Sequence, residues 1–180
     1  KYYHWNMNYI LTTARLGLRN WQMDDLDAAM EMNGDPEVMR FFPQTYGREA
    51  SIGMIEKFQT HFAKHGYTYY AVDALDGEKC LGFVGLMYQD YDAPFTPCTD
   101  IGWRLRKKFW GKGYATEAAK ACLIHAFEEL GLKEIVSTTS HDNEPSRRVM
   151  EKIGMTFMGE YIHPKVPNPH RLQPSVWYRI

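Results

Sequence analysis

The chain has 180 residues, of which 44% are hydrophobic, and its formal net charge at pH 7 is −1. This length and apolar content predict one domain with a sizeable core. The near-zero charge gives no overall attraction to nucleic acid or to an anionic membrane, and no apolar run reaches membrane-spanning length. We therefore expect a soluble, cytoplasmic protein that binds neither nucleic acid nor membrane.

The cysteines and the first residues support two smaller expectations. Cys80, Cys98 and Cys122 are odd in number and far from a C-x-x-C spacing. Such a pattern is typical of a reducing compartment and argues against disulfides and against a metal site. Residues 1–9 are aromatic-rich and patternless, so we interpret them as a tail on a single domain spanning residues 1–180. The sequence leaves open whether two copies of the chain form a homodimer.

The first half of the chain alternates strand and helix patterns. Asp24 or Asp25 can begin a short helix, which Gly34-Asp35-Pro36 ends. Asp76-Gly77 is the best hairpin signal in the chain. We expect strands over residues 11–19, 67–74 and 79–88, helices over 24–32 and 48–64, and a loop with two prolines over 91–97.

The next stretch predicts a strand, a glycine turn and a helix. Apolar residues first alternate as in a strand with one apolar face, at Ile101, Trp103 and Leu105. Helical spacing follows, at Ala115, Ala118, Ala119, Cys122, Ala126, Phe127 and Leu130. Gly111 and Gly113 lie in the turn between them. Because glycines allow close approach and the first helical N–H groups are free, this turn predicts an anion site.

Two common anion motifs are excluded by the spacing of this turn. Only Lys112 separates the glycines and Tyr114 follows, which does not match a phosphate-binding P-loop. Thr116 replaces the third glycine of the dinucleotide fingerprint. The turn alone is weak support for a ligand, and a tight turn without one is the alternative.

The second half of the chain contributes three more strands and a helix. Asn143-Glu144-Pro145-Ser146 begins the helix, with proline in the first turn, and Gly154 ends it. We expect strands over residues 134–139, 156–162 and 175–180, with a proline-rich loop over 163–171. The whole pattern predicts an α/β (α+β) fold with one mixed, mostly antiparallel sheet of about six to seven strands and helices on both faces.

Several pieces of the chain together resemble a known family. They occur in the order TARLGLRNW, DPEVMRFF, GFVGL, DIGWRL, WGKGYATEA and NEPSRRVMEKIGM, from about Leu11 to Met155. These pieces are similar to the GNAT superfamily of acetyl-CoA-dependent N-acetyltransferases, in its RimJ/RimL-like branch. The resemblance implies acetyl transfer from acetyl-CoA to a primary amine, with coenzyme A as product. It also implies that the strands ending at Leu105 and Thr139 splay apart around the cofactor.

The resemblance also implies which residues contact the cofactor. KFWGKGYATEA is similar to the family's pyrophosphate loop, with Lys108 at the position where glutamine or arginine is usual. Six cations lie near this loop, two of them at the start of the later helix: Arg106, Lys107, Lys108, Lys112, Arg147 and Arg148. We expect at least two of them to contact phosphate. The expected cofactor residues are Trp103, Leu105, Arg106, Lys107, Lys108, Gly111, Lys112, Gly113, Tyr114, Ala115, Asn143, Ser146 and Arg147.

Acetyl transfer to an amine needs a base, because the amine is mostly protonated at neutral pH. Asp100 occupies the place where many relatives carry glutamate, so its shorter side chain would act directly or through water. Its alternative role is to orient a loop N–H. Glu160, His141 and His163 are rival bases.

A weak acid should protonate the departing thiolate. The family's tyrosine is replaced by Met150, and Ser146 resembles the hydroxyl that the RimJ/RimL-like branch places near the cofactor sulfur. Asn143 resembles a cofactor-contacting asparagine. Ser146 and Asn143 could instead support the first turn of their helix.

The acceptor amine is not specified by these patterns. A protein N-terminus or a small-molecule amine both fit. The alternative function is a non-catalytic acyl-CoA-binding sensor or scaffold module, which the missing tyrosine and the shortened base keep open.

Overall fold

A computed structural model of the chain describes residues 8–180. Most of the tail expected over residues 1–9 therefore lies outside the described residues. The described strands are β1 (Leu11–Thr12), β2 (Leu16–Arg19), β3 (Tyr69–Ala74), β4 (Gly82–Gln89), β5 (Cys98–Leu105), β6 (Val136–Ser140), β7 (Thr156–Ile162) and β8 (Pro174–Arg179). The α-helices are α1 (Leu26–Gly34), α2 (Arg48–His65), α3 (Tyr114–Ile124) and α4 (Glu144–Lys152). Short helical turns cover Met23–Asp25, Lys107–Phe109 and His125–Glu129.

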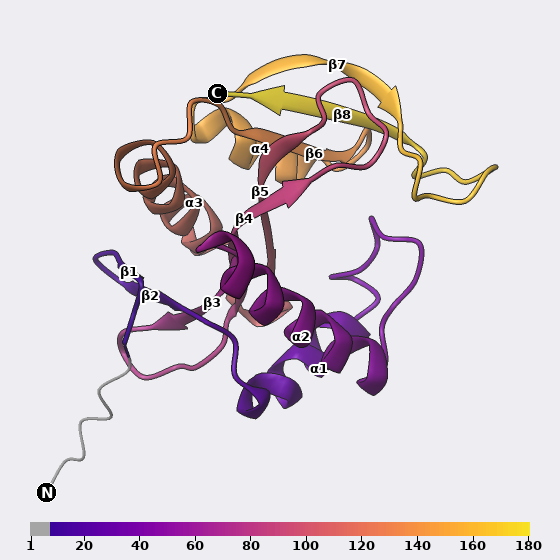
Figure 1. Cartoon of the computed structure of the whole chain (residues 1–180). Helices are drawn as coiled ribbons and strands as arrows, with labels where there is room; N and C mark the ends of the chain where they lie inside the picture. Colours follow the sequence, from indigo (N-terminus) through magenta and orange to yellow (C-terminus); the bar gives the residue numbers. More distant parts are fainter. Residues whose placement is uncertain (1–7) are drawn as a thin grey trace, which may run out of the picture.

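The strands form one sheet in the order β1-β2-β3-β4-β5-β6-β8-β7 (Figure 1). Every neighbouring pair is antiparallel except β5 and β6, which are parallel. The expected α/β class and the mixed, mostly antiparallel sheet are confirmed. No described helix is long and apolar enough to cross a membrane.

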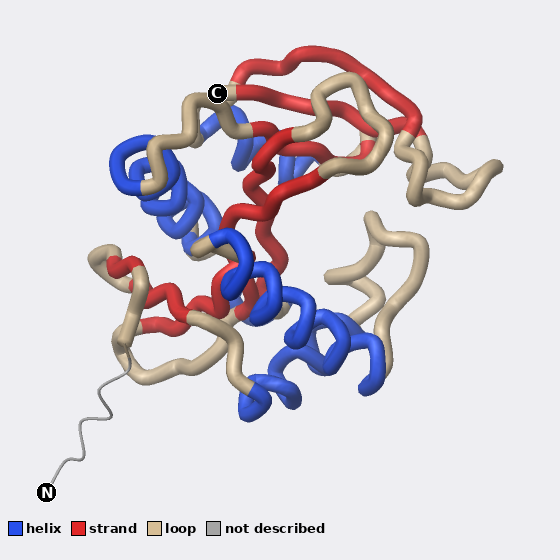
Figure 2. Tube along the Cα trace, in the orientation of Figure 1, coloured by secondary structure: helices blue, strands red, loops and turns tan. Residues whose placement is uncertain are grey.

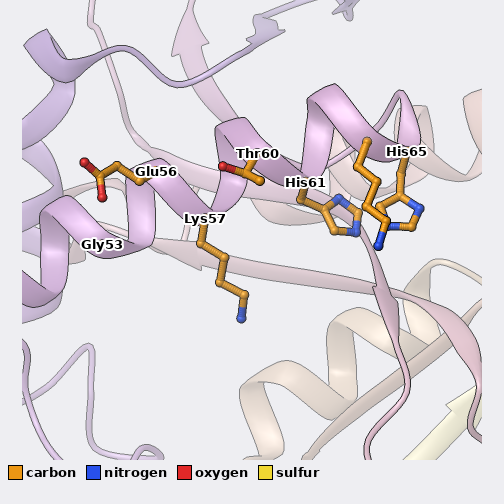
Figure 3. A pocket seen from close by; sticks show the side chains of 7 residues that line it. Gly53, Glu56, Lys57, Thr60, His61 and His65 are labelled. Carbon is orange, nitrogen blue, oxygen red and sulfur yellow. The ribbon is translucent and has the colours of Figure 1, made fainter.

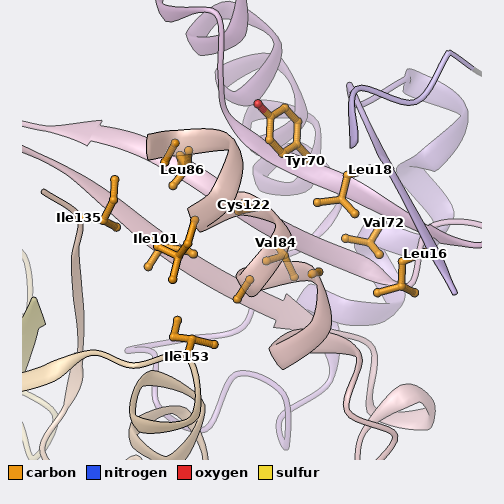
Figure 4. Packing of buried hydrophobic residues seen from close by; sticks show 14 of the residues in the cluster. Leu16, Leu18, Tyr70, Val72, Val84, Leu86, Ile101, Cys122, Ile135 and Ile153 are labelled. Atoms are coloured by element: carbon orange, nitrogen blue, oxygen red, sulfur yellow. The ribbon is translucent and has the colours of Figure 1, made fainter. Parts of the chain in front are cut away.

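Helices cover both faces of the sheet (Figure 2). Alternate residues of a strand point to opposite faces, so each face carries apolar side chains that the helices bury. On one face, α3 and α4 share a hydrophobic core with Leu18 of β2, Val84 of β4 and Ile101 of β5 (Figure 4). On the other face, α1 and α2 lie against Ala71 and Phe83. The side chains that alternate along β5 therefore face two different environments, and the site residues are divided between them.

Residues 8–180 form eight strands, where the sequence predicts about six to seven. The strand expected over residues 11–19 is two short strands, since the chain turns back at Thr13 and the Thr13 amide bonds to the Leu16 carbonyl at 2.8 Å. The strand expected from Lys79 begins only at Gly82. Cys80 adopts φ +47°, a left-handed conformation that interrupts the extended chain.

The expected separation of the two central strands is present. β5 and β6 pair only at Asp100 with Val136, and one further contact joins the Ser137 hydroxyl to the Ile101 carbonyl at 2.8 Å. Beyond this point β5 continues with β4 alone, while β6 continues with β8. The splay therefore opens toward the ends of both strands, next to the glycine turn and the start of α4.

Candidate functional site

The glycine turn follows β5 directly and leads into α3. Gly111 and Gly113 have φ values of +73° and +78°, so both occupy the left-handed region that favours glycine. The first helical bond runs from the Glu117 amide to the Gly113 carbonyl at 3.0 Å. The four preceding amides consequently have no intrahelical acceptor and can donate to an anion.

The turn between β1 and β2 holds this loop in place. The Arg15 guanidinium donates to the Lys112 carbonyl at 2.9 Å and to the Glu117 carboxylate at 2.7 Å. Thr13 donates its hydroxyl to the same carboxylate at 2.5 Å, and Arg15 lies 4.6 Å over the Tyr114 ring. Sequence reasoning missed this clamp, because no local pattern connects residues 13–15 with a helix about one hundred positions later.

Three of the expected phosphate-binding lysines are exposed around the turn. Lys107, Lys108 and Lys112 all extend into solvent. The ammonium groups of Lys108 and Lys112 lie 5.2 and 5.8 Å from the centre of the Phe109 ring, which is buried in the core. Lys108 also contacts the Glu31 carboxylate, at 3.9 Å, in a long and exposed ion pair that an anion above the turn can replace.

Arg106 is placed differently from the expectation. Its side chain is buried, and its guanidinium donates to the carbonyls of Cys80 and Lys79 at 2.9 and 2.7 Å. It also forms an ion pair with Glu31 of α1 at 2.9 Å. Because these partners occupy the guanidinium, we remove Arg106 from the expected cofactor residues.

The first turn of α4 lies at the open end of β6. The side-chain oxygen of Asn143 accepts the Ser146 amide at 3.3 Å, and its amide donates to Thr139 at 2.8 Å. Asn143 is thus a helix cap. The Ser146 hydroxyl takes no part in the cap, because only its backbone is used. Arg147 donates to the Tyr178 hydroxyl at 3.1 Å and to the His141 carbonyl at 3.1 Å.

The backbone of β5 is open where β6 departs. The carbonyl of Ile101 faces β6, and the carbonyl of Leu105 accepts the Trp110 indole N–H at 2.9 Å. Since backbone groups of alternate residues point the same way, those of Trp103 also face the splay. Trp103 and Leu105 therefore belong to the site through their backbone, while their side chains pack on the α3 face.

Asp100 lies at the point where β5 and β6 separate, and its side chain points to the α1–α2 face. It accepts the Tyr69 hydroxyl at 2.5 Å and the Gln89 amide at 3.0 Å. Burial raises the pKa of Asp100 to about 6, against the lowering effect of these two hydrogen bonds. The alternative role, orienting a loop N–H, finds no support because both donors are side chains.

The rival bases are arranged less favourably. His141 contacts the carboxylates of Asp142 and Glu160 at 2.9 and 3.2 Å, and all three side chains are largely exposed. His163 stacks on Tyr91 at 5.2 Å, and burial lowers its pKa. Met150, at the position of the family's tyrosine, is buried in the core.

A shallow hollow elsewhere follows one side of α2 (Figure 3). All of its lining residues come from this one helix: Gly53, Glu56, Lys57, Thr60, His61, Lys64 and His65. A surface without a second wall encloses little of a ligand. We therefore place the candidate site at the splay of β5 and β6.

Comparisons with known proteins identify the family of the chain. A family profile described as "Acetyltransferase (GNAT) domain" matches residues 15–156, which include Asp100, the glycine turn and the start of α4. The chain is 30% identical over 171 residues to YnaD of Bacillus subtilis (strain 168), an uncharacterized N-acetyltransferase, and the match covers 94% of this chain and 95% of that protein. It is 26% identical over 147 residues to spermidine N(1)-acetyltransferase of Escherichia coli (strain K12), covering 81% and 75%. A solved acetyltransferase (GNAT family) from Bacillus anthracis superposes with a TM-score of 0.78 at 28% identity, covering 94% and 96%.

Proposed function

The chain belongs to the GNAT family of acetyltransferases and is an N-acetyltransferase, and on that premise we propose that it transfers an acetyl group from acetyl-CoA to a primary amine by direct attack in a ternary complex. The family uses acetyl-CoA as its co-substrate and acts on amines. The observation that carries the proposal is a buried carboxylate, Asp100, on the strand that leads into the anion-binding turn. Membership of the RimJ/RimL-like branch and a cytoplasmic location are parts of the same proposal.

The residues around the turn fit the phosphates of coenzyme A. The free amides that begin α3 and the exposed Lys107, Lys108 and Lys112 supply donors of the kind that phosphate needs. Trp103 offers its open backbone groups, and Leu105 its backbone N–H, to the amide-containing arm of the cofactor. Acetyl-CoA, when bound, supplies the acetyl thioester.

Asp100 acts as the base in this proposal. A carboxylate with a pKa near 6 is ionised at neutral pH and is a stronger base than an ordinary aspartate. It takes the proton of the incoming ammonium directly or through water. Tyr69 and Gln89 fix the position of the carboxylate by hydrogen bonds.

Two further groups complete the transfer. The Trp103 N–H, which faces the splay, can donate to the oxygen that becomes negative as the amine attacks. The half-buried Ser146 hydroxyl, left free by the helix cap, can protonate the departing thiolate. No covalent enzyme intermediate is required, since both substrates meet in the same site.

Calorimetric titration with acetyl-CoA tests the proposal directly. We expect wild-type binding, and we expect Gly111→Val to lose it, because valine is strained at φ +73° and places its side chain over the turn. Gly131→Val is the matched control. Gly131 has φ +67° and equally open surroundings. It follows the helical turn His125–Glu129, which continues α3 at the end away from the glycine turn.

Both variants should lose similar stability, so a loss of affinity confined to Gly111→Val assigns the turn to phosphate binding. Equal affinity in all three proteins would remove that assignment. An amine screen by thiol release then separates the two functional classes. Acetyl-CoA binding without any thiol release would favour the sensor or scaffold module.

A further inference from the structure

Arg104 has an unusual environment on the α1–α2 face of β5. Its guanidinium lies 4.2 Å from the centre of the Phe42 ring, 5.8 Å from Tyr46 and 5.2 Å from Phe83. Its one hydrogen bond is to the neutral side-chain oxygen of Asn33 at 2.8 Å, and its Nε is buried without a partner among residues 8–180. The side chain remains partly exposed, so a ligand can reach it.

The charge of this arginine is not compensated by the described chain. The groups that act on it electrostatically are the hydroxyls of Tyr46 and Tyr69, and burial lowers the pKa of Arg104 to about 10. Arg19 and Arg106, the two arginines that are fully buried among the described residues, both pair with carboxylates. An unpaired guanidinium costs stability, and aromatic contacts recover only part of that cost. A bound anion would complete its coordination.

Arg104 shares one face of one strand with the proposed base. Asp100, Gly102 and Arg104 alternate along β5, so their side chains point to the same side. Their spacing puts the α-carbons of Asp100 and Arg104 about 13 Å apart. Gly102 lies between them, and a β-carbon there would meet the Tyr69 ring at 3.0 Å. The Tyr69 ring therefore packs over Gly102, and the proposed base and the cation lie on either side of this ring along the strand.

We propose that the acceptor is a primary amine that also carries a carboxylate several bonds away, and that Arg104 binds this carboxylate. The proposal rests on the acetyl transfer proposed above and narrows its acceptor. With the amine at the Asp100 end, the acid extends past the Tyr69 ring toward the loop that holds Phe42 and Tyr46. A planar guanidinium is well suited to a carboxylate, because it can donate two parallel hydrogen bonds.

Two lysines strengthen the preference for an acid over a polycation. Lys57 of α2 interacts electrostatically with both Asp100 and Lys165, and Lys165 lies 4.8 Å over the Tyr91 ring. Figure 3 shows Lys57 extending from α2 on a different side from Glu56. Asp100 thus has two cations, Lys57 and Lys165, as electrostatic partners, and shares its face of β5 with Arg104. A polyamine would bring further positive charge to them, whereas an amino acid would bring a compensating negative charge.

The experiment compares acceptors that differ only in this charge. Initial rates of thiol release from acetyl-CoA are measured with ω-amino acids from glycine to aminooctanoate, with the carboxamide of each, and with spermidine. We expect kcat/KM to favour acids over their amides by about 10- to 100-fold at the best chain length, the range expected for a charged hydrogen bond. Arg104→Gln should reduce this preference to near one, while Arg104→Lys should keep part of it.

Arg40→Gln is the control variant. Arg40 is exposed and stacks on Phe41 at 4.7 Å, so it shares the aromatic contact without the burial. It should leave the acid preference unchanged. A second readout needs no turnover: the preferred acid should raise the thermal unfolding midpoint of the wild type, but not that of Arg104→Gln.

The outcomes separate this inference from the proposed function. Turnover with equal rates for acids and amides, or with spermidine preferred, overturns the inference and leaves acetyl transfer intact. An acid preference that survives Arg104→Gln overturns the role of Arg104. Absence of acetyl-CoA binding removes the proposed function and this inference with it. If Arg104→Gln does not fold, the wild-type ratio of acid to amide still decides the acceptor class.

Discussion

At the scale of single residues, the environment of Asp100 predicts the pH dependence of the reaction. The base works only as a carboxylate, and its pKa of about 6 lies below that of the acceptor amine. Because the carboxylate itself takes the proton of the ammonium, we expect log kcat/KM to rise with pH on a slope of one below about pH 6 and to level off between pH 6 and the pKa of the amine. Asp100→Asn should lower the rate by about 100-fold, a typical general-base effect, and leave a slope of one throughout.

Asp100→Asn should also change how the stability of the fold depends on pH, because it removes the buried group that ionises. Burial raises the folded-state pKa of Asp100 above the usual value of 3.8, so its stabilising contribution is present below about pH 4 and is lost as pH rises through about 6. The loss is roughly 3 kcal/mol at 1.4 kcal/mol per pKa unit. Urea unfolding at pH 4 and pH 8 should show this loss in the wild type and not in Asp100→Asn. A parallel loss in both proteins would contradict the raised pKa.

At the scale of elements, the β1–β2 turn should tune cofactor affinity. Arg15 fixes the Lys112 carbonyl and the first turn of α3, yet it is half-exposed and its ion pair with Glu117 contributes little stability. We expect Arg15→Ala to weaken acetyl-CoA binding several-fold while it changes the unfolding free energy by less than about 1 kcal/mol. Isothermal titration and urea unfolding measure the two effects.

The matched control is Arg179→Ala. Arg179 is exposed to the same degree and pairs with Glu134 at the end of β8, at 3.4 Å. Arg179→Ala should change neither the affinity for acetyl-CoA nor the unfolding free energy appreciably. If both alanine variants weaken acetyl-CoA binding equally, the effect is one of overall charge and the clamp has no specific role.

At the scale of the whole molecule, a buried ion network joins the first half of the sheet. Arg19 donates to Asp73 at 2.9 Å and to Asp25 at 2.8 Å, and all three side chains are buried. Asp73 also accepts the Cys80 amide at 2.8 Å, which fixes the start of β4. Burial would raise the pKa of Asp73, but these donors outweigh it and hold that pKa below its usual value.

Removing one partner of this network should be far more costly than removing an exposed one. Asp73→Ala leaves a buried guanidinium undercompensated and should destabilise the fold by roughly 3–5 kcal/mol. Lys79 contacts the same carboxylate at 3.4 Å but is half-exposed, so Lys79→Ala should cost less than about 1 kcal/mol. Because the pKa of Asp73 is lowered, its contribution is present above about pH 4 and is lost in acid. If Asp73→Ala and Lys79→Ala lower the unfolding free energy by similar amounts, the buried ion pairs of Asp73 contribute no more than its exposed one.

The elements of the fold were predictable because their signals are local. The alternation of Ile101, Trp103 and Leu105 indicated β5, and helical spacing indicated α3. The glycine turn was equally clear, because a left-handed backbone favours glycine at Gly111 and Gly113. The errors also have local causes: a turn at Thr13 without glycine or proline, and a non-glycine residue with positive φ at Cys80.

The sequence by itself determined the order of strands and helices, the glycine turn and the strand that bears the proposed base. Only the tertiary structure decided the partners of the charged side chains. Arg106 and Arg104 look alike in sequence, yet the first pairs with Glu31, 75 positions away, and the second lacks a carboxylate. Arg15 reaches Glu117 across 102 positions. Backbone conformation follows from neighbours a few residues apart, whereas the compensation of a charge depends on whichever distant segment the fold brings beside it.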